Sequence, residues 1–224
     1  VSECQCKEGE LTGLWSYFYE ESLDKMVAPD WNYADFNAIP MIAILKEHAD
    51  KLEAETLACL GEACLNACKA IMKRDLTIIY TNPCIMDMYV TIMCGEMFDK
   101  PELSKYGRKK LDMMYRHVMA DKTFDEYNCP GYSILIANVF AIMLRHISDE
   151  EVQKKVGELN DIVWEMLGEH FHAKTGELGG PNLRRYENLF TDRDKSIYEY
   201  AVGAELICGG KEDYDLMDLV YNLK

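Results

Sequence analysis

Apolar residues recur at intervals of three and four along most of the chain, which is the spacing of one face of an α-helix. Residues 10–26 show it through Leu11, Leu14 and Phe18. The same periodicity predicts helices over residues 34–49, 53–73, 83–98, 101–120, 132–147, 149–171, 196–208 and 212–223. A β-like run is confined to the letters LTIIY at 76–80. The pattern predicts an all-α fold.

The predicted helices alternate in character along the chain. The more apolar ones, with few charges on any side, are residues 34–49, 83–98, 132–147 and 196–208. The amphipathic and charged ones are residues 53–73, 101–120 and 149–171. A helix that is apolar all round has to be buried, whereas an amphipathic helix covers it from outside. We therefore expect inner and outer helices to alternate in helical hairpins, within one domain over residues 1–224.

A repeat supports these hairpins. Three inner segments are introduced by an aromatic residue and an asparagine, at Asn32, Asn82 and Asn128, which are 50 and 46 residues apart. Each inner segment ends near an aspartate, from which an outer helix begins; these aspartates are Asp50, Asp99 and Asp149. Asparagine, aspartate and an early proline are typical of helix starts. The repeat indicates two-helix units packed side by side.

Inner and outer helices in hairpins, with polar aromatic–Asn turns opening the inner helices, resemble the α/α toroid of six-hairpin glycosidases and polysaccharide lyases. Residues 126–186 are the most family-like part, and the likeness extends loosely over about residues 30–210. A complete six-hairpin ring is longer than this chain, which supplies about four hairpins. The resemblance therefore implies a shortened or open ring, a fragment, or a ring completed by an oligomer. An open α-solenoid is the alternative fold.

Charge and cysteine content limit the binding partners and the cellular compartment that we expect. Asp and Glu number 39 against 24 Lys and Arg, for a net charge of −15, which disfavours binding to nucleic acid or to anionic lipid. No segment approaches the roughly 20 apolar residues of a membrane helix, and the first ten residues lack the pattern of a signal peptide. Nine cysteines, mostly within helical patterns, indicate reduced core thiols. We expect a cytoplasmic protein.

The turns that enter the inner helices meet at one end of a toroid, so their polar residues are the candidate site. Aromatic faces stack on sugars, while Asn, Asp and Arg bind hydroxyl or uronic carboxyl groups. The predicted substrate-binding residues are Trp31, Asn32, Asp35, Tyr80, Asn82, Tyr127, Asn128, Arg184 and Arg185. The predicted catalytic residues are Asp125, Glu126, Tyr132, His172 and Tyr186.

Two reactions stay open for a saccharide at this site. A hydrolase would pair Asp125 or Glu126 with Asp35 or Asp192 as its two carboxyl groups. A lyase would neutralise the substrate carboxylate with an asparagine or arginine, such as Asn128 or Arg185, and would use a tyrosine, Tyr132 or Tyr186, as base and acid. Neither reaction calls for a cofactor. The sequence thus predicts a carbohydrate-active enzyme without choosing its reaction.

Plainer interpretations exist for the same residues. Asn82 and Asn128 are both followed closely by proline and fit helix caps, and the tyrosines of these turns fit packing between hairpins. His170 and His172 lack a third ligand at metal spacing, so no metal site is expected, and either histidine fits an acid/base role or a helix C-terminus. Cys129, at a helix N-terminus, would have a lowered pKa. Alternatives to the carbohydrate-active enzyme are therefore a helical scaffold that binds a protein partner, or a small-molecule lyase or isomerase similar to the linalool dehydratase-isomerases.

Overall fold

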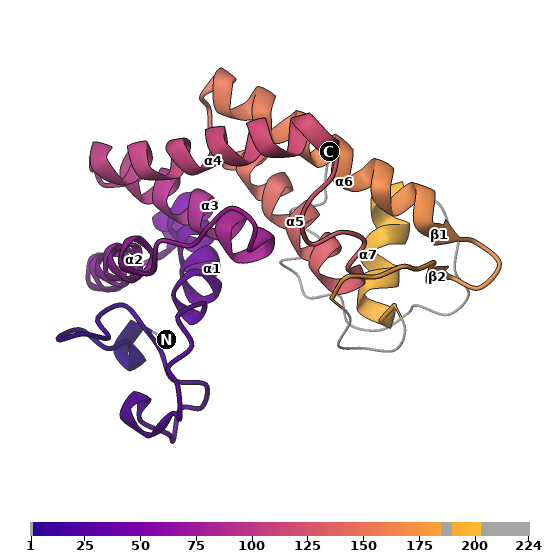
Figure 1. Ribbon diagram of the computed structural model, residues 1–224. Coiled ribbons are helices and arrows are strands. Elements are labelled where there is room, and N and C mark those ends of the chain that lie inside the picture. Colours follow the sequence, from indigo (N-terminus) through magenta and orange to yellow (C-terminus); the bar gives the residue numbers. More distant parts are fainter. Residues whose placement is uncertain (1, 185–189, 203–224) are drawn as a thin grey trace. The chain divides into compact units, whose positions relative to one another are not determined.

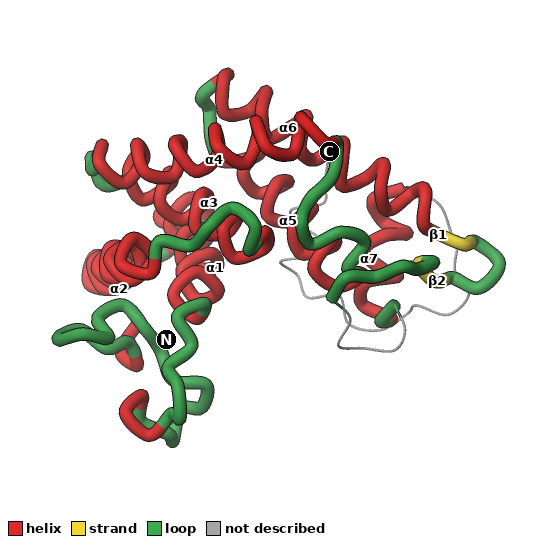
Figure 2. The backbone as a smooth tube through the Cα atoms, viewed as in Figure 1, coloured by secondary structure: helices red, strands yellow, loops and turns green. Residues whose placement is uncertain are grey.

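The computed structural model describes residues 2–184 and 190–202, and within them the fold is all-α, as predicted (Figure 1). Figure 2 shows helix through most of these residues and strand only in one short hairpin. The α-helices are α1 (Tyr33–Glu47), α2 (Ala54–Arg74), α3 (Thr81–Met97), α4 (Pro101–Asp121), α5 (Pro130–His146), α6 (Glu150–His170) and α7 (Asp192–Val202). The antiparallel hairpin is β1 (Phe171–His172) with β2 (Glu177–Leu178), and short 3-10 turns are η1 (Ser2–Cys4), η2 (Leu23–Lys25) and η3 (Ala49–Lys51).

The helices α1 to α6 begin and end within two residues of the predicted segments. Their start signals act as expected in three places. Asp149 caps α6 by accepting a hydrogen bond from the Val152 backbone N–H at 2.9 Å, and Pro101 and Pro130 are the first residues of α4 and α5. The predicted helix over 212–223 and the end of that over 196–208 lie outside the described residues.

The predicted helix over residues 10–26 is wrong. Only the short turn η2 forms there, although Leu14 is buried as expected. Gly13 has a φ of 93°, and a Cβ at this position would lie 2.1 Å from the backbone oxygen of Asn66 in α2. The Gly13 N–H donates to the Cys6 carbonyl at 2.8 Å, and the Cys6 N–H donates to Leu14 at 2.9 Å. Close packing on α2 and this exchange of backbone bonds replace the helix that the periodicity suggests.

Burial alternates between successive helices as the pattern predicts. Every residue from 81 to 95 of α3 is buried, and α5 is buried over most of its surface. The helices α2, α4 and α6 instead show buried residues at helical intervals, with exposed charged residues between them. In α6, for example, Val152, Val156, Leu159 and Val163 are buried along one face.

The chain divides into two compact units. The first comprises Val1–Ile78 and Met86–Leu111, and the second comprises Ile79–Ile85 and the chain from Asp112 onward. The hairpin partners α1 and α2 pack together in the first unit, and α5 packs against α6 and α7 in the second. Sequential helices are therefore packed as hairpins within each unit. The closed or open ring, and a single domain over the whole chain, stay predictions.

Two glycines permit a close approach of α3 and α4 in the first unit. A Cβ added to Gly95 would lie 2.4 Å from the backbone nitrogen of Ser104. A Cβ added to Gly107 would lie 2.5 Å from the hydroxyl of Thr91 and 3.0 Å from the carbonyl of Met88. Neither position has room for a side chain, so the spacing of this hairpin depends on both glycines.

Candidate functional site

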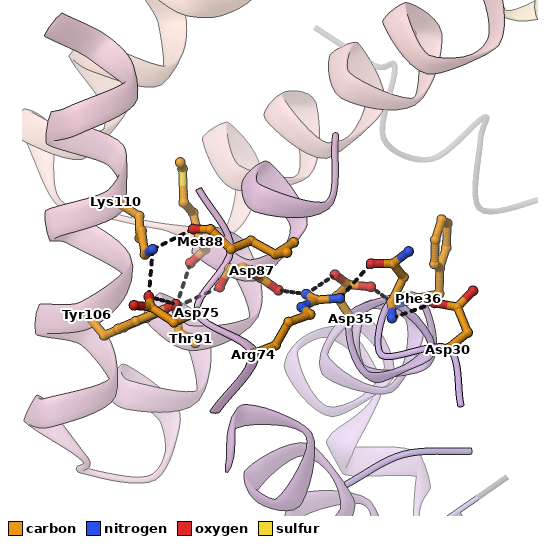
Figure 3. A network of polar contacts seen from close by, with 12 residues as sticks. Asp30, Asp35, Phe36, Arg74, Asp75, Asp87, Met88, Thr91, Tyr106 and Lys110 are labelled. Carbon is orange, nitrogen blue, oxygen red and sulfur yellow. Dashed lines mark hydrogen bonds and ion pairs between the residues drawn. The ribbon is translucent and has the colours of Figure 1, made fainter. Parts of the chain in front are cut away.

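The first polar cluster of the molecule surrounds Arg74, the last residue of α2 (Figure 3). Its guanidinium donates to Asp35 of α1 at 2.9 Å and to Asp87 of α3 at 2.6 Å. It also donates to Asn32, at the start of α1, at 2.6 Å. We call these four residues the Arg74 cluster. It joins three helices of the first unit through one cation.

The Arg74 cluster is closed to solvent. The side chains of Asp35, Asp87 and Arg74 are exposed by 0%, 1% and 8%. Burial raises the pKa of Asp35 to about 6 in spite of the nearby Arg74 charge. Burial, followed by the charge of Asp35, raises the pKa of Asp87 well above its usual range. One arginine thus faces two carboxyl groups that are not readily ionised at the same time. Because the cluster is buried, it is suited to holding the helices together and not to binding a substrate.

Two of the predicted substrate-binding residues, Asn32 and Asp35, lie in this closed cluster. Asn32 occupies the N-cap position of α1, yet its side chain makes no capping bond and instead accepts from Arg74. The neighbouring Trp31 ring has the ammonium group of Lys73 at 5.6 Å from its centroid. The sequence analysis did not select Asp87, although an acid in the apolar middle of a helix signals a buried partner.

In the second unit, the turn over residues 124–129 is fastened to the segment over residues 179–184. The Asn128 side-chain amide donates to the carbonyls of Gly179 at 2.6 Å and Pro181 at 3.0 Å. The Asn182 amide donates back to the Asn128 carbonyl at 2.8 Å, and the Leu183 N–H donates to the Tyr127 carbonyl at 3.2 Å. Four hydrogen bonds therefore hold the turn and the later segment together.

The capping interpretation of the two asparagines is wrong. Asn128 has a φ of 45°, in the left-handed region, and the residue at the N-cap position of α5 is Cys129. Asn82 lies inside the first turn of α3, which begins at Thr81. Its side chain donates to Glu126 at 2.7 Å, so both asparagine amides join separate segments of the chain.

A second arginine cluster lies where this turn meets the start of α3. Glu126 is only 4% exposed and accepts from the backbone N–H of Asn82 at 2.8 Å as well as from its side chain. The same carboxylate pairs with the guanidinium of Arg184. That guanidinium lies over two aromatic rings, 5.2 Å from the centroid of Tyr80 and 4.8 Å from that of Tyr132. We call these five residues the Arg184 cluster.

The Arg184 cluster is accessible, unlike the Arg74 cluster. The Arg184 side chain is 29% exposed, and both tyrosines are half-buried. A guanidinium has five N–H donors, and its face attracts aromatic rings. The cluster therefore holds a cation next to two aromatic rings, which suits a ligand that carries a carboxylate next to a flat apolar surface. All five of its members are predicted site residues.

The other predicted site residues are placed elsewhere. Asp125 pairs with His117 at 2.8 Å on the exposed surface. Tyr127 contacts His170 at 2.8 Å, and the exposed His172 contacts the hydroxyl of Thr175 at 2.9 Å. Arg185 and Tyr186, and also the side chain of Asp192, lie outside the described residues.

Cys129 does not have the lowered pKa that its place before α5 suggests. It is 2% exposed, and burial is the largest effect on its thiol, whose pKa is raised. The thiol donates to the carbonyl of Arg184, which requires the proton to stay on sulfur. A nucleophilic Cys129 is therefore disfavoured, and with it the main reason to consider a dehydratase-isomerase.

A family described as Domain of unknown function (DUF8769) matches residues 16–217. The chain belongs to the DUF8769 family. Both arginine clusters and the fastened turn fall within the matched range of this DUF8769 chain. No curated protein and no solved structure matches it.

Across residues 2–184 and 190–202, no cluster of three or more His, Cys, Asp or Glu side chains is arranged to hold a metal ion. The described helices include none that is both long and apolar enough to cross a membrane.

Proposed function

We propose that this chain is a carbohydrate-active enzyme of the lyase type, and that the Arg184 cluster binds a sugar carrying a carboxylate. The observation that carries the proposal is the partly exposed Arg184 side chain, which is paired with Glu126 and has its guanidinium over the rings of Tyr80 and Tyr132. Aromatic faces stack on sugar rings, and a guanidinium pairs with a carboxylate through parallel hydrogen bonds.

The placement of carboxyl groups favours elimination over hydrolysis. A glycoside hydrolase needs two carboxyl groups facing one glycosidic bond. Among the described residues of the second unit, the Arg184 cluster contains one, Glu126, while Asp125 is directed to His117. Glu126 accepts three hydrogen-bond contacts already, so its part is to hold Arg184 and Asn82 in place.

In the proposed reaction, the substrate carboxylate pairs with Arg184, which leaves the carbon next to that carboxylate more acidic. The hydroxyl oxygen of Tyr132, in its deprotonated form, takes the proton from this carbon. The electrons of the broken C–H bond form a carbon–carbon double bond, the adjacent C–O bond to the next sugar breaks, and the leaving oxygen receives a proton from Tyr132 or water. Arg184 lies over the ring of Tyr132, so the cation that pairs with the substrate carboxylate also holds the substrate next to this tyrosine.

The proposal is tested with polygalacturonate as the charged polymer and galactan as its neutral counterpart. The wild-type protein is expected to release unsaturated products, seen by ultraviolet absorbance, from the first polymer and not from the second. Arg184→Ala and Tyr132→Phe should each lower the rate by roughly 10²-fold, while Arg116→Ala, on an exposed face of α4, should not.

Circular dichroism melting of each variant separates a lost site from a lost fold. No product from polygalacturonate, alginate or hyaluronate with the folded wild-type protein would count against the enzyme and favour the scaffold that binds a protein partner. Equal reaction rates for the wild-type protein and Arg184→Ala would show that the Arg184 cluster takes no part in the reaction.

A further inference from the structure

His170, the last residue of α6, is held in one tautomer by its own helix. Its Nδ1 lies 2.8 Å from the backbone carbonyl oxygen of Met166, one turn earlier. A carbonyl oxygen can only accept a hydrogen bond, so Nδ1 carries the proton. The neutral ring therefore presents Nε2 as an acceptor with a fixed direction.

Tyr127 is the group that meets this acceptor. Its hydroxyl oxygen lies 2.8 Å from Nε2 of His170, and with Nδ1 protonated the phenol has to be the donor. The two rings meet edge to face, with centroids 5.3 Å apart and planes at 83°. The backbone of Tyr127 is fixed as well, because its carbonyl accepts from Leu183. Both side chains are half-buried, so small molecules can reach them.

We infer that Tyr127 and His170 form a base-activated nucleophile, which reacts with acyl and sulfonyl electrophiles. A hydroxyl, a neutral imidazole within hydrogen-bond reach of it, and a third group that orients the imidazole are the parts of an activated nucleophile. Here these parts are Tyr127, His170 and the Met166 carbonyl. The inference goes beyond the proposed function, since it concerns different residues and different chemistry from the Arg184 cluster.

With a sulfonyl fluoride, the proposed reaction is a substitution at sulfur. The Tyr127 oxygen attacks sulfur as its proton moves to Nε2 of His170, an O–S bond forms, the S–F bond breaks, and fluoride leaves. The imidazolium then returns its proton to water. An acyl ester reacts in the same way, with the alcohol as leaving group and with water releasing the acid from the acyl-tyrosine afterwards.

Other tyrosines of the chain supply the contrast. Tyr115 donates to the carboxylate of Glu158, and Tyr17 donates to that of Asp30 at 2.6 Å. A carboxylate is a weaker base than imidazole. Its hydrogen bond and charge also hold the proton on the phenol, as the raised pKa of Tyr115 beside Glu158 illustrates. The neutral imidazole of His170 can take the proton without imposing that negative charge.

The experiment uses an arylsulfonyl fluoride with the whole protein, and mass spectrometry of its peptides measures the labelling rate of each tyrosine. Tyr127 should be labelled roughly 10²-fold faster than Tyr115 and the highly exposed Tyr19. His170→Gln should bring Tyr127 down to the rate of those internal controls, while His172→Gln should leave it unchanged.

Equal labelling of Tyr127 and Tyr19 in the wild-type protein would overturn the inference without any variant. So would fast labelling of Tyr127 that persists in a folded His170→Gln protein. The nitrogen chemical shifts of His170 give a second measurement: a proton on Nδ1 is expected, and a proton on Nε2 would contradict the donor assignment. None of these outcomes depends on cleavage of a polysaccharide, so this inference and the proposed function can fail separately.

Discussion

The two arginine clusters use the same ingredients in opposite settings. Arg74 binds two aspartates and an asparagine, and Arg184 binds a glutamate that also holds an asparagine. The Arg74 side chain is 8% exposed, whereas that of Arg184 is 29% exposed and has its guanidinium over two tyrosine rings. Residue types alone therefore do not separate a structural ion cluster from a candidate site.

Burial and the ratio of charges make the difference. In the Arg74 cluster the acids outnumber the cation and all three groups are desolvated, so each depends on the others for its stability. In the Arg184 cluster the described residues bring one carboxylate, that of Glu126, to the cation, and the Arg184 side chain stays 29% exposed. Such a group can exchange water for a ligand at little cost to the fold.

The largest decrease in the free energy of unfolding is expected from Arg74→Leu. This change leaves Asp35 and Asp87 buried without their counter-charge, and breaking a buried ion cluster costs about 3–5 kcal/mol. Urea unfolding followed by circular dichroism measures the free energy of unfolding. Arg116→Ala, which removes an exposed arginine of α4, is the matched control and should change little. A loss for Arg74→Leu no larger than that of the control would contradict a structural role for the cluster.

A smaller decrease in the free energy of unfolding is expected from Arg184→Ala. Glu126 keeps both hydrogen bonds from Asn82, and water can reach the vacated guanidinium position, so the cost should be about 1–3 kcal/mol. Hydrogen exchange of peptides should show the loss in α5 and α6, which belong to the second unit. If Arg184→Ala destabilised the protein as much as Arg74→Leu, the contrast between an accessible and a closed cluster would be lost.

The pH dependence of stability should follow the Arg74 cluster. Burial raises the pKa of Asp35 from 3.8 to about 6 and raises that of Asp87 well above its usual range. The native state then holds protons that the unfolded chain releases above about pH 3.8, so the stabilisation is fully present below that pH and is lost as the pH rises from there through 6 for Asp35, and at still higher pH for Asp87. The slope reaches at most about 1.4 kcal/mol per pH unit for each group.

Asp87→Asn isolates this effect, because it removes one of the two titrating groups and the like charge next to Asp35. Urea unfolding of both proteins between about pH 5 and about pH 8 should give a flatter profile for the variant than for the wild type. Parallel profiles, or a wild-type stability that rises relative to the variant with pH, would mean that the two carboxyl groups do not resist ionisation.

Local periodicity accounts for most of the fold that the sequence could predict. The helices α1 to α6 follow from apolar spacing together with signals such as Pro101, Pro130 and the Asp149 cap. The helix expected over 10–26 fails because the same spacing also fits a loop whose Leu14 is buried by packing on α2. Periodicity reports which residues are buried, and tertiary contacts decide the backbone that buries them.

The candidate site could be predicted only as a set of residue types. Tyr80, Asn82, Glu126, Tyr132 and Arg184 were all proposed from polar turns, but the pairing of Glu126 with Arg184 spans 58 residues and has no local signal. Selecting polar residues near the starts of the inner helices also gave Asn32 and Asp35, which the structure places in the closed Arg74 cluster. Solvent exposure, which distinguishes the two clusters, is a property of packing and cannot be read from a turn.

The most direct test is a nuclear magnetic resonance titration of the arginine side-chain N–H signals with oligogalacturonate, using a neutral galactose oligomer as the control. We expect the charged sugar to shift the Arg184 signal together with the ring signals of Tyr80 and Tyr132 and to leave the Arg74 signal in place. The neutral sugar should shift none of them. An Arg184 signal that stays unmoved at saturating sugar, or that moves no more than that of Arg74, would contradict the assignment of the Arg184 cluster as the binding site.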